Sequence, residues 1–316
     1  MLDIAVGNLT SPAVLAFVIG LLAATWGTSL RLPPQVASLL STYLLVAIGF
    51  KGGTALRYTP VADLWAPALA TLALGVVTPL IAFAVLRRLG HFGVPDAAAI
   101  AAHFGSVSVV TFTAATAAAI TAGLEPERFL PALVVVLEVP GIAIALLLAH
   151  SQAGGNLRDA CREAIAGKCV VLLAGGVVIG AIASPQAAAS VDPLFVGLFP
   201  GLLTLFLLDL GAMTGERLGD VRKSGPFLVG FALVMPLVFG AIGLLGGVAA
   251  GLSTGGTAVL AVMGASASYI AAPAAVSIAL PGANPALGLT AALGVTFPFN
   301  LVIGIPLFVA ASRALT

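Results

Sequence analysis

Apolar stretches of the length that a membrane-spanning helix needs recur from one end of this chain to the other. Such a helix takes roughly 20 consecutive, mostly apolar residues. Of the 316 residues, 60% are hydrophobic and only 8% are charged, and the mean hydropathy is +1.17. A soluble fold rarely has so little charge to cover so much apolar surface. We therefore predict an all-α integral membrane protein without a soluble domain.

Ten candidate transmembrane helices follow from the spacing of the apolar runs, with boundaries uncertain by several residues. Charged residues gather in the loops between them. The predicted helices are Pro12–Thr28, Gln35–Leu56, Leu64–Leu89, Ala97–Thr121, Phe129–His150, Lys168–Ser184, Leu194–Glu216, Pro226–Ala250, Gly256–Leu280 and Pro285–Arg313.

Basic residues set the expected orientation of these spans. With ten spans both termini share one side, and that side carries only Arg57, Arg128 and Arg313. Cytoplasmic loops are enriched in Lys and Arg. We therefore expect a multi-pass protein of the cell (inner) membrane with both termini outside and the Asn156–Lys168 loop in the cytoplasm. The opposite side carries Arg31, Arg87, Arg88, Arg158, Arg162, Lys168, Arg217, Arg222 and Lys223.

Several function classes are disfavoured by what the sequence lacks. The net charge of +1 gives no basic surface for nucleic acid. Cys161 and Cys169 form no CxxC motif, so a disulfide or metal role is not expected. Neither a GxxxxGK[ST] loop nor an HExxH motif is present, which argues against an ATP-driven pump or a protease and against an enzyme in general. No basic segment precedes the first apolar run, so we expect no cleaved signal peptide.

The two halves of the chain resemble each other in four short stretches that keep their order. The offsets between partners lie between 158 and 162 residues. Four ordered matches at a nearly constant spacing indicate an internal repeat. The matched pairs are FVIG ending at Gly20 and VVIG ending at Gly180, IGFKGG (Ile48–Gly53) and LGAMTG (Leu210–Gly215), SVS (Ser106–Ser108) and SAS (Ser266–Ser268), and EVP (Glu138–Pro140) and TFP (Thr296–Pro298).

Each repeat holds five helices, and an odd number makes the second copy begin from the opposite face of the membrane. This is the inverted-repeat arrangement of secondary transporters. We predict a first repeat over residues 1–155, a cytoplasmic loop over 156–168 and a second, inverted repeat over 169–316.

The stretches HFGSVSVVTFTAA (His103–Ala115) and MGASASYIAAPAA (Met263–Ala275) interrupt apolar helices at equivalent places in the two repeats. Unwound backbone survives in a membrane only where it is buried in protein or lines a wet cavity. We predict two broken helices that meet near mid-membrane and bind a solute. The alternative is that the small residues serve tight helix packing. The pairing of the two stretches and Pro273 favour the broken helices.

Glu138 lies far from both ends of its predicted span and just before Pro140. An ionisable residue at that depth is a functional hypothesis by default. We expect it to coordinate a cation or carry a proton, with a structural hydrogen bond from a protonated carboxyl as the alternative.

Other polar residues within the spans receive structural predictions. Lys51 and Asp209 occupy equivalent places in the two halves, and we expect a structural ion pair between them or, alternatively, a lining of the solute path. His103 is expected to be a packing residue with one hydrogen bond. Asn284 and Asn300 are expected to cap or bridge helices.

At these residues the sequence resembles the sodium-dependent bicarbonate transporter family over nearly its full length. The most specific part is GASASYIAAPAAVSIALPGANPALGLTAALGVTFPFNLVIGIPLF (Gly264–Phe308). IGFKGGTALR (Ile48–Arg57) and the His103–Ala115 stretch are also similar to family segments.

The resemblance implies ten helices in a core and a gate domain, a homotrimer, and Na⁺-coupled uptake of bicarbonate without an organic cofactor. It implies that Gly105, Ser106, Val107 and Ser108 face the anion from one side and that Ser266, Ala267 and Ser268 face it from the other. It also implies a Na⁺ ion beside them. The residues expected at that ion are Thr111, Glu138, Ser266 and Tyr269, together with backbone carbonyls.

This chain departs from the family in three places. It has Tyr269 and Glu138 where some members have an aspartate, and its Asn156–Lys168 loop is shorter than in the best-known members. We therefore expect the family's PII-like cytoplasmic regulator to bind differently here or not at all. Two further functions stay open: H⁺- or Na⁺-coupled symport of another small anion, and a non-transporting membrane protein that senses bicarbonate.

Overall fold

The computed structural model describes residues 10–153, 162, 166–280 and 282–316, and its described part is built from helices without a strand. The first half contains α2 (Pro12–Thr25), α3 (Pro34–Leu56), α4 (Val61–Arg88), α5 (Val94–Gly105), α6 (Val109–Thr121) and α7 (Leu130–Ala153). The second half contains α9 (Lys168–Ile182), α10 (Pro185–Asp192), α11 (Phe199–Lys223), α12 (Pro226–Ala249), α13 (Thr254–Ala265), α14 (Ala271–Ala279), α15 (Pro285–Leu289), α16 (Phe297–Phe299) and α17 (Ile305–Leu315).

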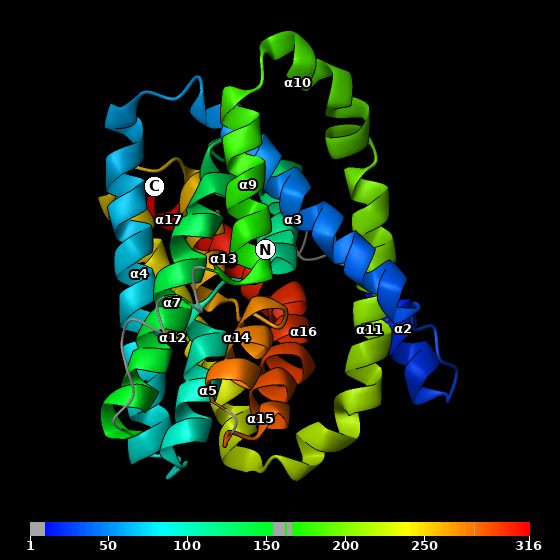
Figure 1. The fold of residues 1–316 in the computed structure, drawn as a ribbon, viewed down its shortest axis with the longest axis vertical. Coiled ribbons are helices and arrows are strands. Elements are labelled where there is room, and N and C mark those ends of the chain that lie inside the picture. The colour runs from blue at the N-terminus through cyan, green and yellow to red at the C-terminus, as the bar shows by residue number, and fades with distance from the viewer. Residues whose placement is uncertain (1–9, 154–161, 163–165, 281) are drawn as a thin grey trace.

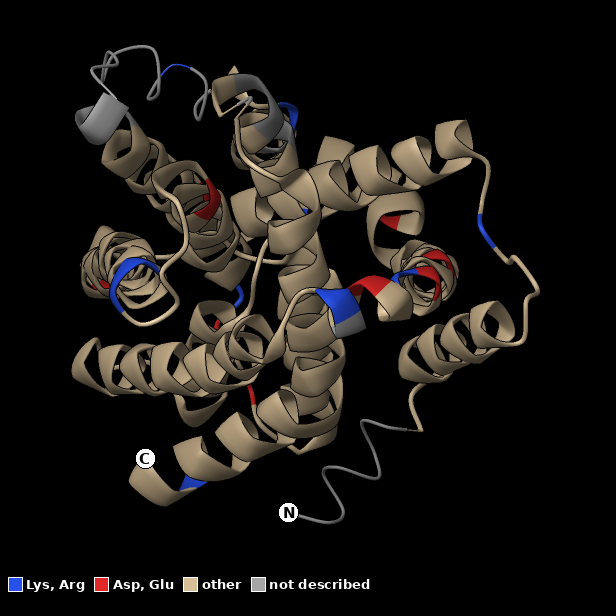
Figure 2. Cartoon of the chain, turned by 90° about the horizontal axis from the view of Figure 1, so that it is seen from below, with Lys and Arg blue, Asp and Glu red and all other residues tan. Residues whose placement is uncertain are grey.

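Seven segments of the described chain are long and apolar enough to cross a membrane, and three shorter apolar helices accompany them. The three shorter ones are Pro12–Thr25, Val170–Ile182 and Thr254–Ala265. Figure 2 shows how little charge the helical body carries: Lys, Arg, Asp and Glu form short coloured patches on a largely tan ribbon. The protein is therefore a multi-pass helical membrane protein.

Two of the helices break where the sequence predicts it. α5 ends at Gly105, and α6 starts at Val109, with Ser106 and Ser108 in extended conformations between them. α13 ends at Ala265 and α14 starts at Ala271. The prediction of two interrupted helices in the serine-rich stretches is confirmed.

Two helix pairs pack closely enough to exclude side chains from their contact. A methyl group on Gly20 of α2 would overlap the backbone of Leu208 in α11, and one on Gly211 of α11 would overlap the backbone of Phe17. α3 and α9 interlock in the same way through Gly49. Small residues spaced four apart allow such close backbone approach in membranes. In Figure 1, α2 and α11 lie on one side of the molecule, across from α4.

The expected ion pair between Lys51 and Asp209 is wrong. Asp209 is 1% exposed and pairs with Arg31, whose Nε lies 3.0 Å from Asp209 Oδ1. The same oxygen accepts the backbone N–H of Leu32 at 2.8 Å. Lys51 instead holds its Nζ 3.9 Å from the ring centroid of Phe199, a cation–π contact. Arg31 and Leu32 belong to the loop before α3, which the fold places beside Asp209. Their two hydrogen bonds to the buried carboxylate hold this loop in place.

The helical segment at the C-terminal end differs in detail from the expected single helix. Residues Thr290–Thr296 and Asn300–Gly304 are wound as π-helix on either side of α16. Pro298 and Pro306 lie close to these stretches and lack the N–H that an α-helix would use. Residues 185–193, which the sequence analysis left between two predicted spans, are also helical: they form α10 and the start of a π-helical turn over Pro193–Gly197 that leads into α11. α10 forms the top of the molecule in Figure 1.

Candidate functional site

The two helix breaks contact each other directly. The backbone N–H of Ser108 donates to the hydroxyl of Ser266 at 3.0 Å. The backbone N–H of Ser268 donates to the carbonyl of His103 at 2.7 Å. The ring Nδ1 of His103 lies 2.6 Å from the carbonyl oxygen of Ser268. His103 therefore makes the one side-chain hydrogen bond expected of it, and this bond fastens one break to the other.

Ser108 forms the N-cap of α6. Its hydroxyl accepts the backbone N–H of Thr111 at 3.1 Å and also bonds the Thr111 hydroxyl at 2.9 Å. This is the usual way to satisfy a free N–H at a helix start. Because α5 ends where α6 begins, a carbonyl-rich helix end and an N–H-rich helix end lie together at the first break.

At the second break, too, the C-terminal end of one helix lies next to the N-terminal end of another. α13 ends at Ala265, and α14 begins at Ala271, whose neighbour Ala272 donates its N–H to the Ser268 hydroxyl at 3.3 Å. Asn300 donates its side-chain amide to the carbonyl of Ala265 at 2.8 Å. Asn300 thus bridges helices, as expected, and Asn284 caps α15 by accepting the N–H of Ala286.

Glu138 of α7 is buried, and its carboxyl group faces the Ser106 side chain and the Val107 backbone N–H. A close helix contact holds it there. Gly141, one turn further along α7, has no room for a methyl group because the backbone of Gly105 occupies that space. Because Gly105 and Gly141 have no side chains, α7 packs close to the first break, and the Glu138 carboxylate reaches the backbone of that break.

Four polar atoms in this region are buried without a hydrogen bond of normal geometry: the Ser106 hydroxyl, Glu138 Oε2, the Tyr269 hydroxyl and Asn300 Oδ1. Glu138 faces Ser106, and the Tyr269 hydroxyl faces Ser108, at a geometry that falls short of a hydrogen bond. An unpaired buried polar group costs about 1–3 kcal/mol, so native proteins seldom leave several together without a reason. Their clustering at two helix breaks indicates a place where a polar solute or ion completes the hydrogen bonding.

A small cavity of about 10 Å³ lies among these groups. That volume is close to the smallest that holds a water molecule. Both breaks, α7 and α3 contribute to its wall. The lining residues are Leu45, Val107, Ser108, Val109, Glu138, Ser268, Tyr269, Ile270 and Ala271.

The structure brings most of the predicted site residues together. Val107, Ser108, Glu138, Ser268 and Tyr269 line the cavity. The remaining predicted residues support its wall: Gly105 packs on Gly141, Ser106 faces Glu138, Thr111 bonds Ser108, and the Ser266 hydroxyl joins Ser108 to the carbonyl of Met263. Ala267 is buried in the second break. Lys51 and Asp209 make their contacts elsewhere.

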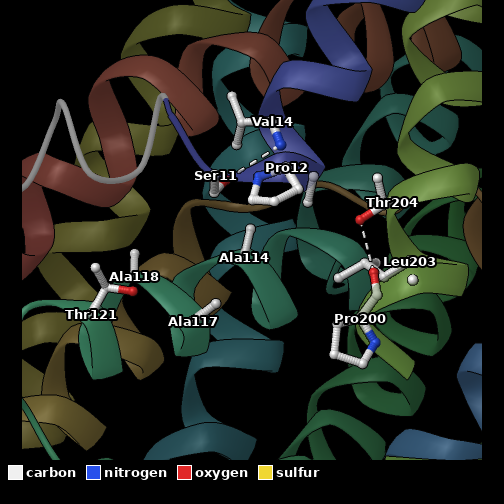
Figure 3. A pocket seen from close by; sticks show the side chains of 12 residues that line it. Ser11, Pro12, Val14, Ala114, Ala117, Ala118, Thr121, Pro200, Leu203 and Thr204 are labelled. Atoms are coloured by element: carbon white, nitrogen blue, oxygen red, sulfur yellow. Dashed lines mark hydrogen bonds between the residues drawn. The ribbon is translucent and has the colours of Figure 1, made fainter. Parts of the chain in front are cut away.

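A larger cavity of about 420 Å³ opens between the starts of α2 and α11 and the face of α6 (Figure 3). Its wall is mostly apolar, with Ala114, Ala117 and Ala118 along α6. Two of its three hydroxyl-bearing lining residues, Ser11 and Thr204, are bonded within their own helices, and Thr121 is the third. Ser11 accepts the N–H of Val14, and Thr204 donates to the carbonyl of Pro200. None of the described residues that line this cavity is charged.

Sequence reasoning missed two parts of the site. Leu45 is an ordinary apolar residue of an apolar helix, and nothing in the sequence distinguishes it. Gly141 could have been found, because a glycine one residue after Pro140 in a spanning helix is a signal for close backbone approach.

Two broken helices that meet within the apolar body of a many-helix membrane protein are an arrangement typical of secondary transporters. Comparison with protein families supplies the particular assignment. The model of the Na⁺-dependent bicarbonate transporter superfamily matches residues 12–313, nearly the whole chain, and the protein belongs to this family. A comparison with individually curated proteins gave no match. Membership of a transporter family implies a non-enzymatic membrane protein for which Na⁺ and bicarbonate are the expected solutes.

Proposed function

We propose that this protein takes up bicarbonate together with Na⁺ by alternating access. The observation that carries the proposal is the contact of the two helix breaks beside a buried carboxylate, where several buried polar atoms lack a hydrogen bond of normal geometry. The solute groups that satisfy them are an oxyanion, which accepts from hydroxyl and N–H donors, and a hard cation, which takes oxygen ligands.

The two ions have separate places in this proposal. The N-terminal ends of α6 and α14, with Ser108 and Ser268, stabilise the negative charge of the anion. Glu138 and nearby carbonyl oxygens stabilise Na⁺, with Thr111, Ser266 and Tyr269 as further oxygen donors. A bare carboxylate would repel an anion at close range. Na⁺ between them removes the repulsion, which makes each ion favour the binding of the other.

The arrangement of helices supports ten spans in two inverted repeats. The seven long segments and the three shorter apolar helices together give ten. The repeat relates the first and second spans of one half to those of the other. It therefore exchanges the α2–α11 pair with the α9–α3 pair, and both pairs show the same glycine interlock. We infer that these four helices form the gate and that the broken helices belong to the core.

Orientation and assembly are further parts of the proposal. The bias of basic residues supports a loop at Asn156–Lys168 on the cytoplasmic side of the inner membrane and both termini on the opposite side. Most of this loop lies outside the described residues. A homotrimer and a PII-like regulator stay predictions from the family resemblance. Native mass measurement of the purified protein tests the trimer.

Flux in proteoliposomes tests the proposed function. With an imposed inward Na⁺ gradient, the protein should accumulate labelled bicarbonate above its equilibrium level. Accumulation driven by ΔpH alone would instead show proton coupling. Binding of bicarbonate without any flux would show a sensor. A panel of small anions in the same assay identifies the preferred substrate, and thermal stabilisation with and without Na⁺ checks that the two ions bind together.

A further inference from the structure

One wall of the small cavity comes from outside the broken helices and α7. Leu45 of α3 is 2% exposed and lies against the cavity beside Glu138, Ser108 and Ser268. All other lining residues belong to the two breaks or to α7. Leu45 is therefore the contact through which α3 covers the polar groups of the site.

The walls formed by the two breaks are fastened to each other. Ser108 bonds Ser266, and His103 exchanges two hydrogen bonds with Ser268. Buried hydrogen bonds of this kind are costly to break, because each leaves an unpaired group behind. These walls move as one unit.

α7 is held to that unit by packing. The contact of Gly141 with Gly105 places backbone against backbone, so α7 has no room to move toward the break. Leu45 differs from all these groups because its apolar side chain packs on the cavity without a hydrogen bond. α3 is joined tightly to α9 through Gly49, and it meets α7 tightly at Gly52, about two helical turns from Leu45. Among the described residues, Leu45 is thus the lining residue whose helix is neither hydrogen-bonded to the breaks nor packed backbone to backbone against them.

The size of the cavity limits the solute that fits in this conformation. About 10 Å³ accommodates one water-sized particle, which suits a dehydrated Na⁺ ion. A planar oxyanion of four heavy atoms is larger. In this conformation the cavity is too small for such an anion, and the space available to it depends on the side chains that line the wall.

We propose that Leu45 determines which anions the site admits, by closing over it and setting the space left for the solute. The inference rests on the proposed function in that it uses the same site. It adds a residue outside the serine breaks that limits the substrates to small, compact oxyanions.

The first test measures binding of anions of increasing size, and it is independent of transport. Purified protein in Na⁺ is titrated with formate, bicarbonate, nitrate, acetate and propionate, and thermal stabilisation is recorded. The wild type should respond to the smaller anions only. Leu45→Ala should extend the response to acetate and propionate, with at least a tenfold gain in apparent affinity for acetate relative to formate. Leu45→Phe should weaken the binding of every anion in the series.

Leu44→Ala is the matched control. Leu44 has the same side chain, the same helix and the same 2% exposure, but it is not a lining residue. Both alanine variants lose a buried leucine and should lose similar thermal stability. Only Leu45→Ala should change the order of anion preference. Equal preferences in the two variants, or an unchanged preference in Leu45→Ala, would overturn the inference.

A flux measurement separates this inference from the proposed function. If wild-type protein fails to accumulate bicarbonate in a Na⁺ gradient while Leu45→Ala still widens anion binding, the size filter holds and the proposed transport is wrong. If the wild type transports bicarbonate and Leu45→Ala transports the same narrow set of anions, the transport stands and the size filter is wrong. If neither protein responds to any anion, both are wrong.

Discussion

The backbone N–H of Ser108 donates to the hydroxyl of Ser266 at 3.0 Å, although the two residues are 158 positions apart. This bond joins the start of α6 to the end of α13 and makes one site from two halves of the chain. Each residue belongs to a serine triplet, SVS or SAS, and the two triplets match each other in the sequence. Loss of the bond should therefore affect both breaks.

Ser266→Ala should weaken transport more than it weakens the fold. The change leaves the Ser108 N–H without its acceptor, at a cost of about 1–3 kcal/mol. If this free energy is lost from solute binding, each 1.4 kcal/mol makes the affinity for the solute roughly tenfold weaker. The half-saturating bicarbonate concentration for Na⁺-driven uptake should rise accordingly. Ser312→Ala is the control, because Ser312 is equally buried and bonds only its own helix at Val309. Equal uptake by the two variants would contradict the role of Ser266.

Glu138→Gln should remove the Na⁺ dependence of uptake. The substitution keeps the size of the side chain but removes the negative charge that attracts a cation. We expect Na⁺-driven bicarbonate uptake to fall by roughly tenfold or more, the equivalent of about 1.4 kcal/mol. Glu138→Asp should retain Na⁺ dependence with a higher half-saturating Na⁺ concentration, because the shorter carboxylate still carries the charge. A Na⁺ titration of uptake measures both. Unchanged Na⁺-driven flux in Glu138→Gln would show that the cation binds elsewhere.

The location of the site was readable from the sequence because membrane burial restricts where polar and backbone-breaking residues survive. Ser106, Ser108, Ser266 and Ser268 stand in apolar helices at matching positions, and the broken helices there are confirmed. Glu138 was selected by its depth in the predicted span, its place before Pro140 and the family resemblance, and the structure places it against the first break.

The sequence did not show which residues from distant segments pair with each other. Asp209 could pair with any cation that the fold brought near, and the sequence offered Lys51 at the equivalent repeat position. The fold brings Arg31 instead, from a loop 178 residues away. Leu45 shows the same limit for apolar residues. Among many similar leucines, only the three-dimensional packing of α3 against the breaks distinguishes it.

Gly141→Ala should disturb the site through packing. A methyl group there overlaps the backbone of Gly105, which has no flexible side chain that can move aside. Overpacking of this kind costs about 1–3 kcal/mol, and it pushes α7 and Glu138 away from the break. We expect a lower thermal midpoint and weaker Na⁺ affinity, measured by the Na⁺ titration of uptake.

Gly175→Ala is the control for the glycine test. Gly175 lies inside α9, and a methyl group there meets nothing within 4 Å. Alanine is favoured over glycine within a helix by about 1 kcal/mol, so this variant should be as stable as the wild type or more stable. A similar loss of Na⁺ affinity in both variants would show that helix flexibility, and not the contact with Gly105, is what matters.

The buried carboxylate of Asp209 should stabilise the protein without taking part in ion binding. Its oxygen accepts from Arg31 Nε at 3.0 Å and from the Leu32 N–H at 2.8 Å, which ties the loop before α3 to α11. Asp209→Ala leaves both donors unpaired, and we expect a loss of about 2 kcal/mol in stability. Because Arg31 is 32% exposed and regains water, the loss should be smaller than for a fully buried pair.

Glu216→Ala tests the other partner of Arg31. Glu216 lies 3.1 Å from Arg31 Nη1, but its side chain is 44% exposed. Exposed ion pairs contribute about 0–1 kcal/mol, so this variant should melt within a few degrees of the wild type. Asp209→Asn should fall between the two alanine variants, since its amide oxygen still accepts from Leu32 while the charge is lost. In all three, the half-saturating Na⁺ concentration for uptake should stay within about twofold of the wild type, less than 0.5 kcal/mol. A tenfold rise in Asp209→Asn with an unchanged melting temperature would place Asp209 on the ion path instead, because a merely structural carboxylate affects Na⁺ uptake only through the fold.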